Sequence, residues 1–147
     1  MVADLNMDMF LPLYPLKILT VYGVNESDLG DAIRTLAKPM NLQVQDDPQP
    51  ERNIFVRSDQ YNFIRHGVPA VMPEFGNAKG SKEAAIEKAW LDKRYHAPSD
   101  DLNQPVDKPG AAKFDQFIFN VVEQVANGNA RPQWKQTSFF RRFAKGS

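Results

Sequence analysis

The first ten residues restrict what this chain can fold into more than any other stretch. The run from Val2 to Phe10 predicts a short buried strand that leads into a turn, with Asp8 near the carboxyl end of the strand. In open α/β sheets, ligands bind outside the carboxyl ends of the strands. Asp8 is therefore either a metal ligand or catalytic group, or a turn-forming residue that caps the next segment.

Strand and helix patterns alternate through the first third of the chain. Residues 17–22 are β-branched and aromatic, which predicts a strand. A helix is expected to begin at Ser27 or Asp28, because apolar side chains then recur at helical spacing, and Pro39 ends it. Residues 41–45 predict a further short strand.

The middle of the chain continues this alternation. Ser58 and Asp59 can cap a helix of about two turns that stops at Gly67. Residues 68–72 predict a strand, with its proline near the start, where proline is tolerated. Residues 75–80 predict a flexible loop.

Two more helices follow. Ser81 is expected to cap a helix that runs to about Lys93, and Asp107 opens a helix with a proline near its first position. That last helix is amphipathic and ends at Asn127. Its apolar stripe consists of Phe114, Phe117, Ile118, Val121, Val122 and Val125.

Length and composition exclude several classes of protein. The 147 residues suffice for one domain, and 18 basic residues balance 18 acidic ones, so no charge field favours nucleic acid or an anionic membrane. The absence of cysteine excludes disulfides and thiolate zinc sites. No apolar run approaches a membrane span of about 20 residues. No signal peptide is visible, so the compartment stays open, with export of a parent protein as one option.

Four short segments carry a recognisable pattern. They are Asn6–Met9, Ser58–Phe63, Gly67–Ala70 and Tyr95–Asp100. In order and approximate spacing they resemble the N-x-D-M, S-D-x-x-x-F, G-[IV]-P-A and Y-H-[TSA]-P-x-D segments of the M28 family of zinc metallopeptidases. The resemblance spans Val2 to about Gln124.

The resemblance implies a fold and a reaction. The expected fold class is α/β, a three-layer sandwich with a central mixed β-sheet of the zinc-exopeptidase type, present here in part. The implied reaction is hydrolysis of a peptide bond by a metal-activated water, in the manner of an aminopeptidase. Zinc is the implied cofactor, two ions in the parent enzyme, and a peptide is the implied substrate.

The resemblance also assigns residues to the site. Asp8 would bind one zinc and His96 the other, and the Tyr95 hydroxyl would stabilise the oxyanion. Phe63 would line the substrate pocket. The plain alternatives stay open: a lone histidine before a proline is often a hydrogen-bonded loop residue, and Tyr95 would also suit a half-buried packing position.

Two further aspartates are expected to support the site. Asp59 is interpreted as a helix cap, and Asp100 either holds the loop that carries His96 or orients its imidazole. His66, the only other histidine, lies at a helix end, where it complements the helix dipole.

The departures from the family matter as much as the match. The family's first histidine, bridging aspartate and Glu-Glu pair lie upstream of N-x-D-M, so this chain resembles the C-terminal part of a catalytic domain. We therefore expect no peptidase activity from the chain alone, and weak zinc binding or none. Two rival functions are a non-catalytic binding or assembly module on the same fold and a glutaminyl-cyclase-like zinc enzyme.

The sequence predicts that the chain is organised in two parts. Residues 1–128 form the peptidase-like part, and residues 129–147 form an aromatic and basic tail. The tail is expected to pack on the domain rather than to contact nucleic acid or membrane. An incomplete sheet exposes strand edges, so self-association is also expected.

Overall fold

A mixed four-stranded sheet forms the centre of the fold in a computed structural model that describes residues 1–144. Its strands are β1 (Asp4–Leu5), β2 (Ile18–Tyr22), β3 (Gln43–Gln45) and β4 (Ala70–Gly76). The strand order is β1-β4-β2-β3, in which only the β2–β4 pair is antiparallel. The sheet with its helices confirms the predicted α/β class, while the more specific three-layer sandwich stays a prediction.

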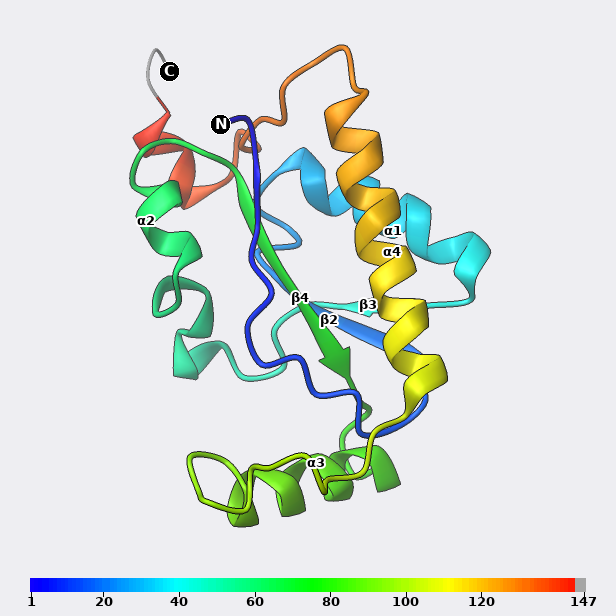
Figure 1. The fold of residues 1–147 in the computed structure, drawn as a ribbon. Coiled ribbons are helices and arrows are strands. Elements are labelled where there is room, and N and C mark those ends of the chain that lie inside the picture. Colours follow the sequence, from blue (N-terminus) through cyan, green and yellow to red (C-terminus); the bar gives the residue numbers. More distant parts are fainter. Residues whose placement is uncertain (145–147) are drawn as a thin grey trace.

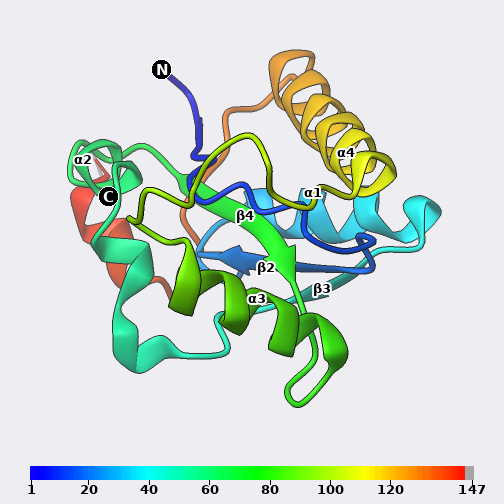
Figure 2. The same cartoon turned by 60° about the horizontal axis from the view of Figure 1, so that its bottom comes forward.

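Four α-helices surround the sheet (Figure 1). They are α1 (Asp28–Ala37), α2 (Gln60–Ile64), α3 (Lys82–Lys93) and α4 (Lys108–Ala126). Helices α1 and α4 lie next to each other, whereas α3 lies past the carboxyl end of β4 and away from that pair (Figure 2). No helix within residues 1–144 is both long enough and apolar enough to cross a membrane.

The main core lies between one face of the sheet and the α1–α4 pair. Side chains alternate across a strand, so Val71 and Phe75 of β4 share this face. Fully buried residues of α1 and α4, such as Ile33 and Phe117, pack against them. Gly30 allows α1 to lie close to the loop after β2, since a Cβ there would lie 1.7 Å from the carbonyl oxygen of Val24.

Side-chain caps begin α3 and α4 as predicted, whereas Ser27 at the N-cap of α1 makes no side-chain capping bond within residues 1–144. The Ser81 hydroxyl accepts a hydrogen bond from the Ala84 amide at 3.1 Å, and Asp107 Oδ1 accepts one from the Gly110 amide at 2.6 Å. Both caps confirm the prediction. Asp59 also stands at an N-cap, that of α2, but its side chain accepts no capping bond within residues 1–144.

Several strand bounds differ from the prediction: β3 and β4 begin two residues later than expected, at Gln43 and Ala70. The opening strand is only Asp4–Leu5, because β1 pairs with β4 at Ala70 and Val71 and then diverges. Phe10 lies outside the strand, and the centroid of its ring is 5.8 Å from the ring centroid of Phe75 and 5.2 Å from that of Phe114. The loop expected at 75–80 is wrong for its first two residues, since Phe75 and Gly76 pair with Leu19 and Ile18 of β2.

The aromatic tail contacts the end of the sheet that α2 covers. Trp134 is buried with Ile64 and Ala70, and Phe140 and Phe143 pack against this cluster. The indole Nε1 of Trp134 donates a 3.1 Å hydrogen bond to the Gly67 carbonyl oxygen. The division of the chain at residue 128 stays a prediction, and residues 145–147 of the expected tail lie outside the described part.

Candidate active site

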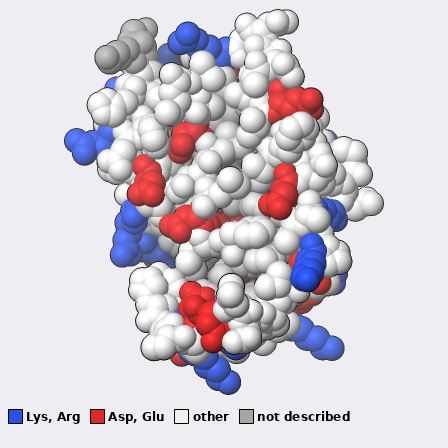
Figure 3. Space-filling model, in the orientation of Figure 1, with Lys and Arg blue, Asp and Glu red and all other residues white. Residues whose placement is uncertain are grey.

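One face of the molecule concentrates acidic side chains. Figure 3 shows Asp and Glu side chains toward the middle of this face, with most Lys and Arg side chains toward its margins. A pocket of about 340 Å³ lies among the N-terminal connector, β2, β4, α3 and the 52–58 segment. Its charged lining residues are Asp8, Arg52, Arg57, Glu74 and Glu87, and Tyr95 contributes a phenol.

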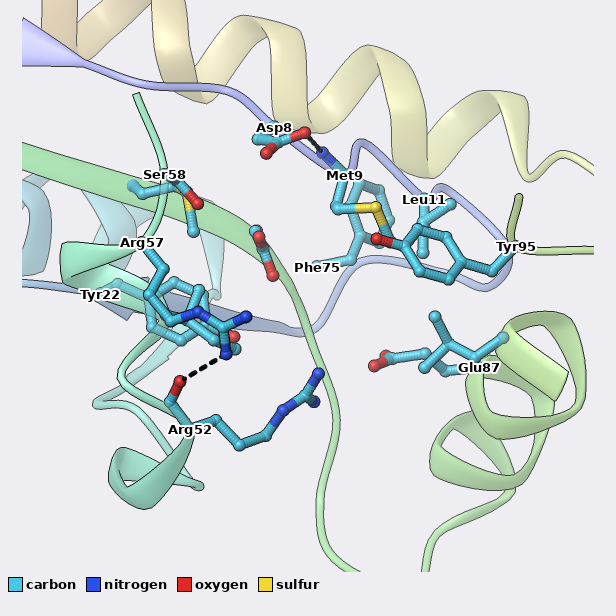
Figure 4. Close-up of a pocket in the computed structure, with 14 residues that line it drawn as sticks. Asp8, Met9, Leu11, Tyr22, Arg52, Arg57, Ser58, Phe75, Glu87 and Tyr95 are labelled. Atoms are coloured by element: carbon cyan, nitrogen blue, oxygen red, sulfur yellow. Dashed lines mark hydrogen bonds between the residues drawn. The ribbon is translucent and has the colours of Figure 1, made fainter. Parts of the chain in front are cut away.

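Asp8 and Tyr95 line the same pocket although they come from the first and last motifs of the chain (Figure 4). Asp8 is exposed, and its Oδ1 accepts a 2.8 Å hydrogen bond from the amide of Met9, which adopts a left-handed backbone with φ of 50°. Tyr95 is 44% exposed and lies against the Trp90 ring. The fold therefore brings two of the predicted site residues together.

His96 lies beside this pocket rather than in its wall. Its ring stacks on that of Tyr95, with 3.9 Å between the centroids and 28° between the planes. The residue is exposed and has a φ of 55°. Its imidazole makes no side-chain hydrogen bond within the described residues, so no protein group there competes for the ring nitrogen that carries a lone pair.

The other predicted residues lie outside the pocket lining. Phe63 is half-buried in α2. Asp59 is exposed near Asp4, whose pKa is raised first by burial and second by the charge of Asp59. Asp100 Oδ1 accepts a 3.1 Å hydrogen bond from the side-chain Nε2 of Gln104. Oε1 of the same Gln104 side chain accepts a 2.6 Å hydrogen bond from Trp90 Nε1. Asp100 thus connects to the loop and to α3.

Glu74 on β4 is the pocket residue with the most perturbed acidity. Burial is the largest cause that raises the pKa of its carboxyl to about 8, the charges of Glu87 and Asp8 contribute to this rise, and a hydrogen bond from Tyr22 opposes it. Because side chains alternate along β4, Glu74 and Met72 face the pocket and Phe75 packs into the core.

Glu87 is held in place at the opposite side of the pocket. Its Oε2 accepts hydrogen bonds from the Tyr14 hydroxyl at 2.8 Å and from Asn77 Nδ2 at 2.6 Å. Asn77 Nδ2 also lies 3.2 Å from the Tyr14 oxygen. Burial, with Glu87 as a smaller cause, raises the pKa of Tyr14, so this phenol stays a donor.

Two arginines complete the pocket from the side facing Glu87 (Figure 4). Arg57 Nη1 donates a 3.4 Å hydrogen bond to the Arg52 carbonyl oxygen, and Arg52 Nη1 donates a 3.1 Å bond to Gln49 Oε1. Neither guanidinium forms an ion pair with a carboxylate within residues 1–144. The pocket therefore holds charges of both signs on separate walls.

Comparison with known proteins decides the family. The model of peptidase family M28 matches residues 1–122, which is most of the chain. The chain belongs to peptidase family M28. No curated protein and no solved structure matches it. Membership in M28 supports a peptidase-type function and peptide substrates, and it confirms the family resemblance seen in the motifs.

Zinc binding, which is expected of an M28 protein, depends on the nitrogen and oxygen ligands that the side chains offer. A catalytic zinc site needs about three nitrogen or oxygen ligands from the protein. The described residues contain no group of three or more His, Cys, Asp or Glu that could hold a metal ion. The described part of this M28 chain therefore does not complete a zinc site with its own side chains.

The motifs did not reveal Glu74, Glu87 or the two arginines. Each of the two glutamates stands outside the four M28 segments, and the predicted strand stopped at Met72, two residues before Glu74. The available signal was the alternation along β4: a strand that continues to Gly76 must place position 74 on the face of Met72.

Proposed function

We propose that this chain supplies one wall of the active site of a zinc-dependent M28 aminopeptidase. In this proposal Asp8 is a ligand to one zinc ion and His96 is a ligand to the other. In M28 enzymes, zinc activates the water molecule that attacks the peptide bond. The observation that carries the proposal is that Asp8 and Tyr95 line one pocket and that His96 stacks on Tyr95.

Tyr95 takes the role of oxyanion stabiliser. Peptide hydrolysis passes through a tetrahedral intermediate whose oxygen carries a developing negative charge, and a neutral hydroxyl donor stabilises that charge as it forms. Contacts with the His96 and Trp90 rings support the Tyr95 ring, while its 44% exposure leaves the phenol accessible to a substrate.

The 147 residues by themselves are proposed to be inactive. Asp8 and His96 are two ligands, fewer than a catalytic zinc requires. The family's water-activating glutamate belongs to the Glu-Glu segment, which has no counterpart in this sequence. Glu74 and Glu87, although they line the pocket, belong to none of the four motif segments.

An aminopeptidase assay tests this proposal. The purified chain, supplied with zinc, is incubated with a set of aminoacyl p-nitroanilides that covers apolar, basic and acidic residues. We expect no zinc-dependent release of p-nitroaniline. Release that requires zinc and disappears in Tyr95→Phe would contradict the proposed inactivity and support the Tyr95 role, whereas release that is indifferent to zinc would indicate a contaminating hydrolase.

A further inference from the structure

The acidic side chain of Glu74 occupies an unusual place in β4. Its neighbours Met72 and Phe75 are buried, so placing a carboxyl group here costs folding free energy. Glu74 nevertheless lines the same pocket as Asp8 and Tyr95. Within the described residues its carboxyl group forms no ion pair with any lysine or arginine.

The surroundings of Glu74 are negatively charged. The charges that act most on this carboxyl belong to Glu87, Asp8 and Asp47, and all of them raise its pKa. Arg52 and Arg57 lie on another wall, where hydrogen bonds to Gln49 and to the Arg52 carbonyl engage them. A cationic group that entered the pocket near Glu74 would therefore be attracted, and an anionic group would be repelled.

The walls beside Glu74 suit the hydrocarbon part of a long side chain. Ile54 and Leu91 line the pocket together with Met72, and the cavity measures about 340 Å³. Lysine and arginine bury an aliphatic stem along apolar surface and leave the charged end for a polar partner. The pocket presents such a surface together with a carboxyl group.

We propose that Glu74 determines specificity and that the pocket takes a peptide whose N-terminal residue is cationic, lysine or arginine. This inference rests on the proposed function, because the roles proposed for Asp8 and Tyr95 would put the scissile bond beside this pocket. The side-chain ammonium or guanidinium of the substrate would pair with the Glu74 carboxylate, whose proton would leave to solvent as the cation enters, while the methylene groups of the substrate contact Met72 and Leu91.

Binding of amino acid amides tests the proposal without requiring hydrolysis. The chain is titrated by NMR in the presence of a chelator with lysine amide, norleucine amide and glutamate amide. Norleucine has a similar aliphatic stem and no charge, so the comparison isolates the ammonium group. We expect lysine amide to bind about tenfold more tightly than norleucine amide, in line with a charge-assisted contact, and glutamate amide to bind weakest.

Glu74→Gln is the matched variant, and Glu123→Gln on the exposed side of α4 is its control. We expect Glu74→Gln to abolish the preference for lysine amide and Glu123→Gln to keep it. Equal binding of lysine and norleucine amides by the unaltered chain would overturn the proposal even if the variant failed to fold. Tightest binding of glutamate amide would assign the pocket to Arg52 and Arg57 instead, and the absence of binding by all three amides would also overturn it. Because zinc is chelated, loss of the proposed metal ligands does not affect this result.

Discussion

Asn6 Nδ2 donates a hydrogen bond of 2.7 Å to Oε1 of Gln60, which is fully buried. The side-chain amide of Gln60 in turn donates a 2.9 Å hydrogen bond from Nε2 to the carbonyl oxygen of Phe55. Gln60 therefore connects the segment that carries Asp8 with the segment that carries Arg57. Through these two bonds, one buried side chain fixes the relative positions of two pocket walls.

Replacement of Gln60 by leucine should destabilise the fold. The change removes both hydrogen bonds and leaves the Phe55 carbonyl without its partner, at a cost of about 1–3 kcal/mol in the free energy of unfolding. Urea unfolding followed by circular dichroism measures this loss. Gln124→Leu on the exposed surface of α4 is the control and should change stability by less than about 0.5 kcal/mol. Equal effects of the two changes would contradict the structural role of Gln60.

Trp134 should anchor the C-terminal tail. Its side chain is 6% exposed and donates to the Gly67 carbonyl, so Trp134→Ala removes a large buried ring and a hydrogen bond. We expect a loss of about 3–5 kcal/mol, measured by chemical unfolding. Phe139 is 57% exposed, and Phe139→Ala should cost far less. A stable Trp134→Ala variant would mean that the tail does not pack on the domain in solution.

The sequence was sufficient for most of the helices. Ser81 and Asp107 are side chains that accept hydrogen bonds from free helix amides, and an apolar stripe at helical spacing has few alternatives, so α3 and α4 could be predicted from local chemistry. The strand at 18–22 was equally clear, because its residues are β-branched and aromatic.

The strand ends could not be predicted, because they depend on pairing between distant segments. Phe75 and Gly76 form strand only because Leu19 and Ile18 lie opposite them. The same dependence hid Glu74, which lines the pocket as a consequence of the length of β4. The motifs, in contrast, pointed to Asp8 and Tyr95 directly, and their presence in one pocket depends on tertiary structure that spacing does not specify.

Glu74 should make the stability of the chain depend on pH. Its pKa in the fold is raised to about 8 from an ordinary value of 4.5, so the fold favours the protonated form. This contribution is fully present below pH 4.5 and is lost as the pH rises through about 8. In metal-free buffer, Glu74→Gln should therefore lose less stability than the unaltered chain between pH 5 and pH 9, with a difference on the order of 4 kcal/mol. Glu123→Gln should follow the unaltered chain, and parallel curves for all three proteins would refute the shift.

The chain should self-associate. Strand β1 is an edge of the sheet, and within the described residues no strand pairs with its outer side. Met7 and Phe10 nearby are 55% and 44% exposed, and Phe119 on α4 is 59% exposed. We expect the mass measured by analytical ultracentrifugation to exceed that of a monomer and to increase with concentration in the micromolar range. A monomeric mass throughout that range would rule out this prediction.

Zinc titration by calorimetry tests the central proposal, the assignment of Asp8 and His96 as metal ligands. It is performed near neutral pH on the unaltered chain, on Asp8→Ala and His96→Ala, and on the controls Asp115→Ala and His66→Ala, whose residues are exposed and belong to no motif. We predict weak zinc binding that Asp8→Ala and His96→Ala each reduce, because each change removes the ligand that the chain offers to one of the two proposed ions, and that both controls keep. Zinc binding that persists in Asp8→Ala and His96→Ala, or that disappears with His66→Ala, would contradict the assignment.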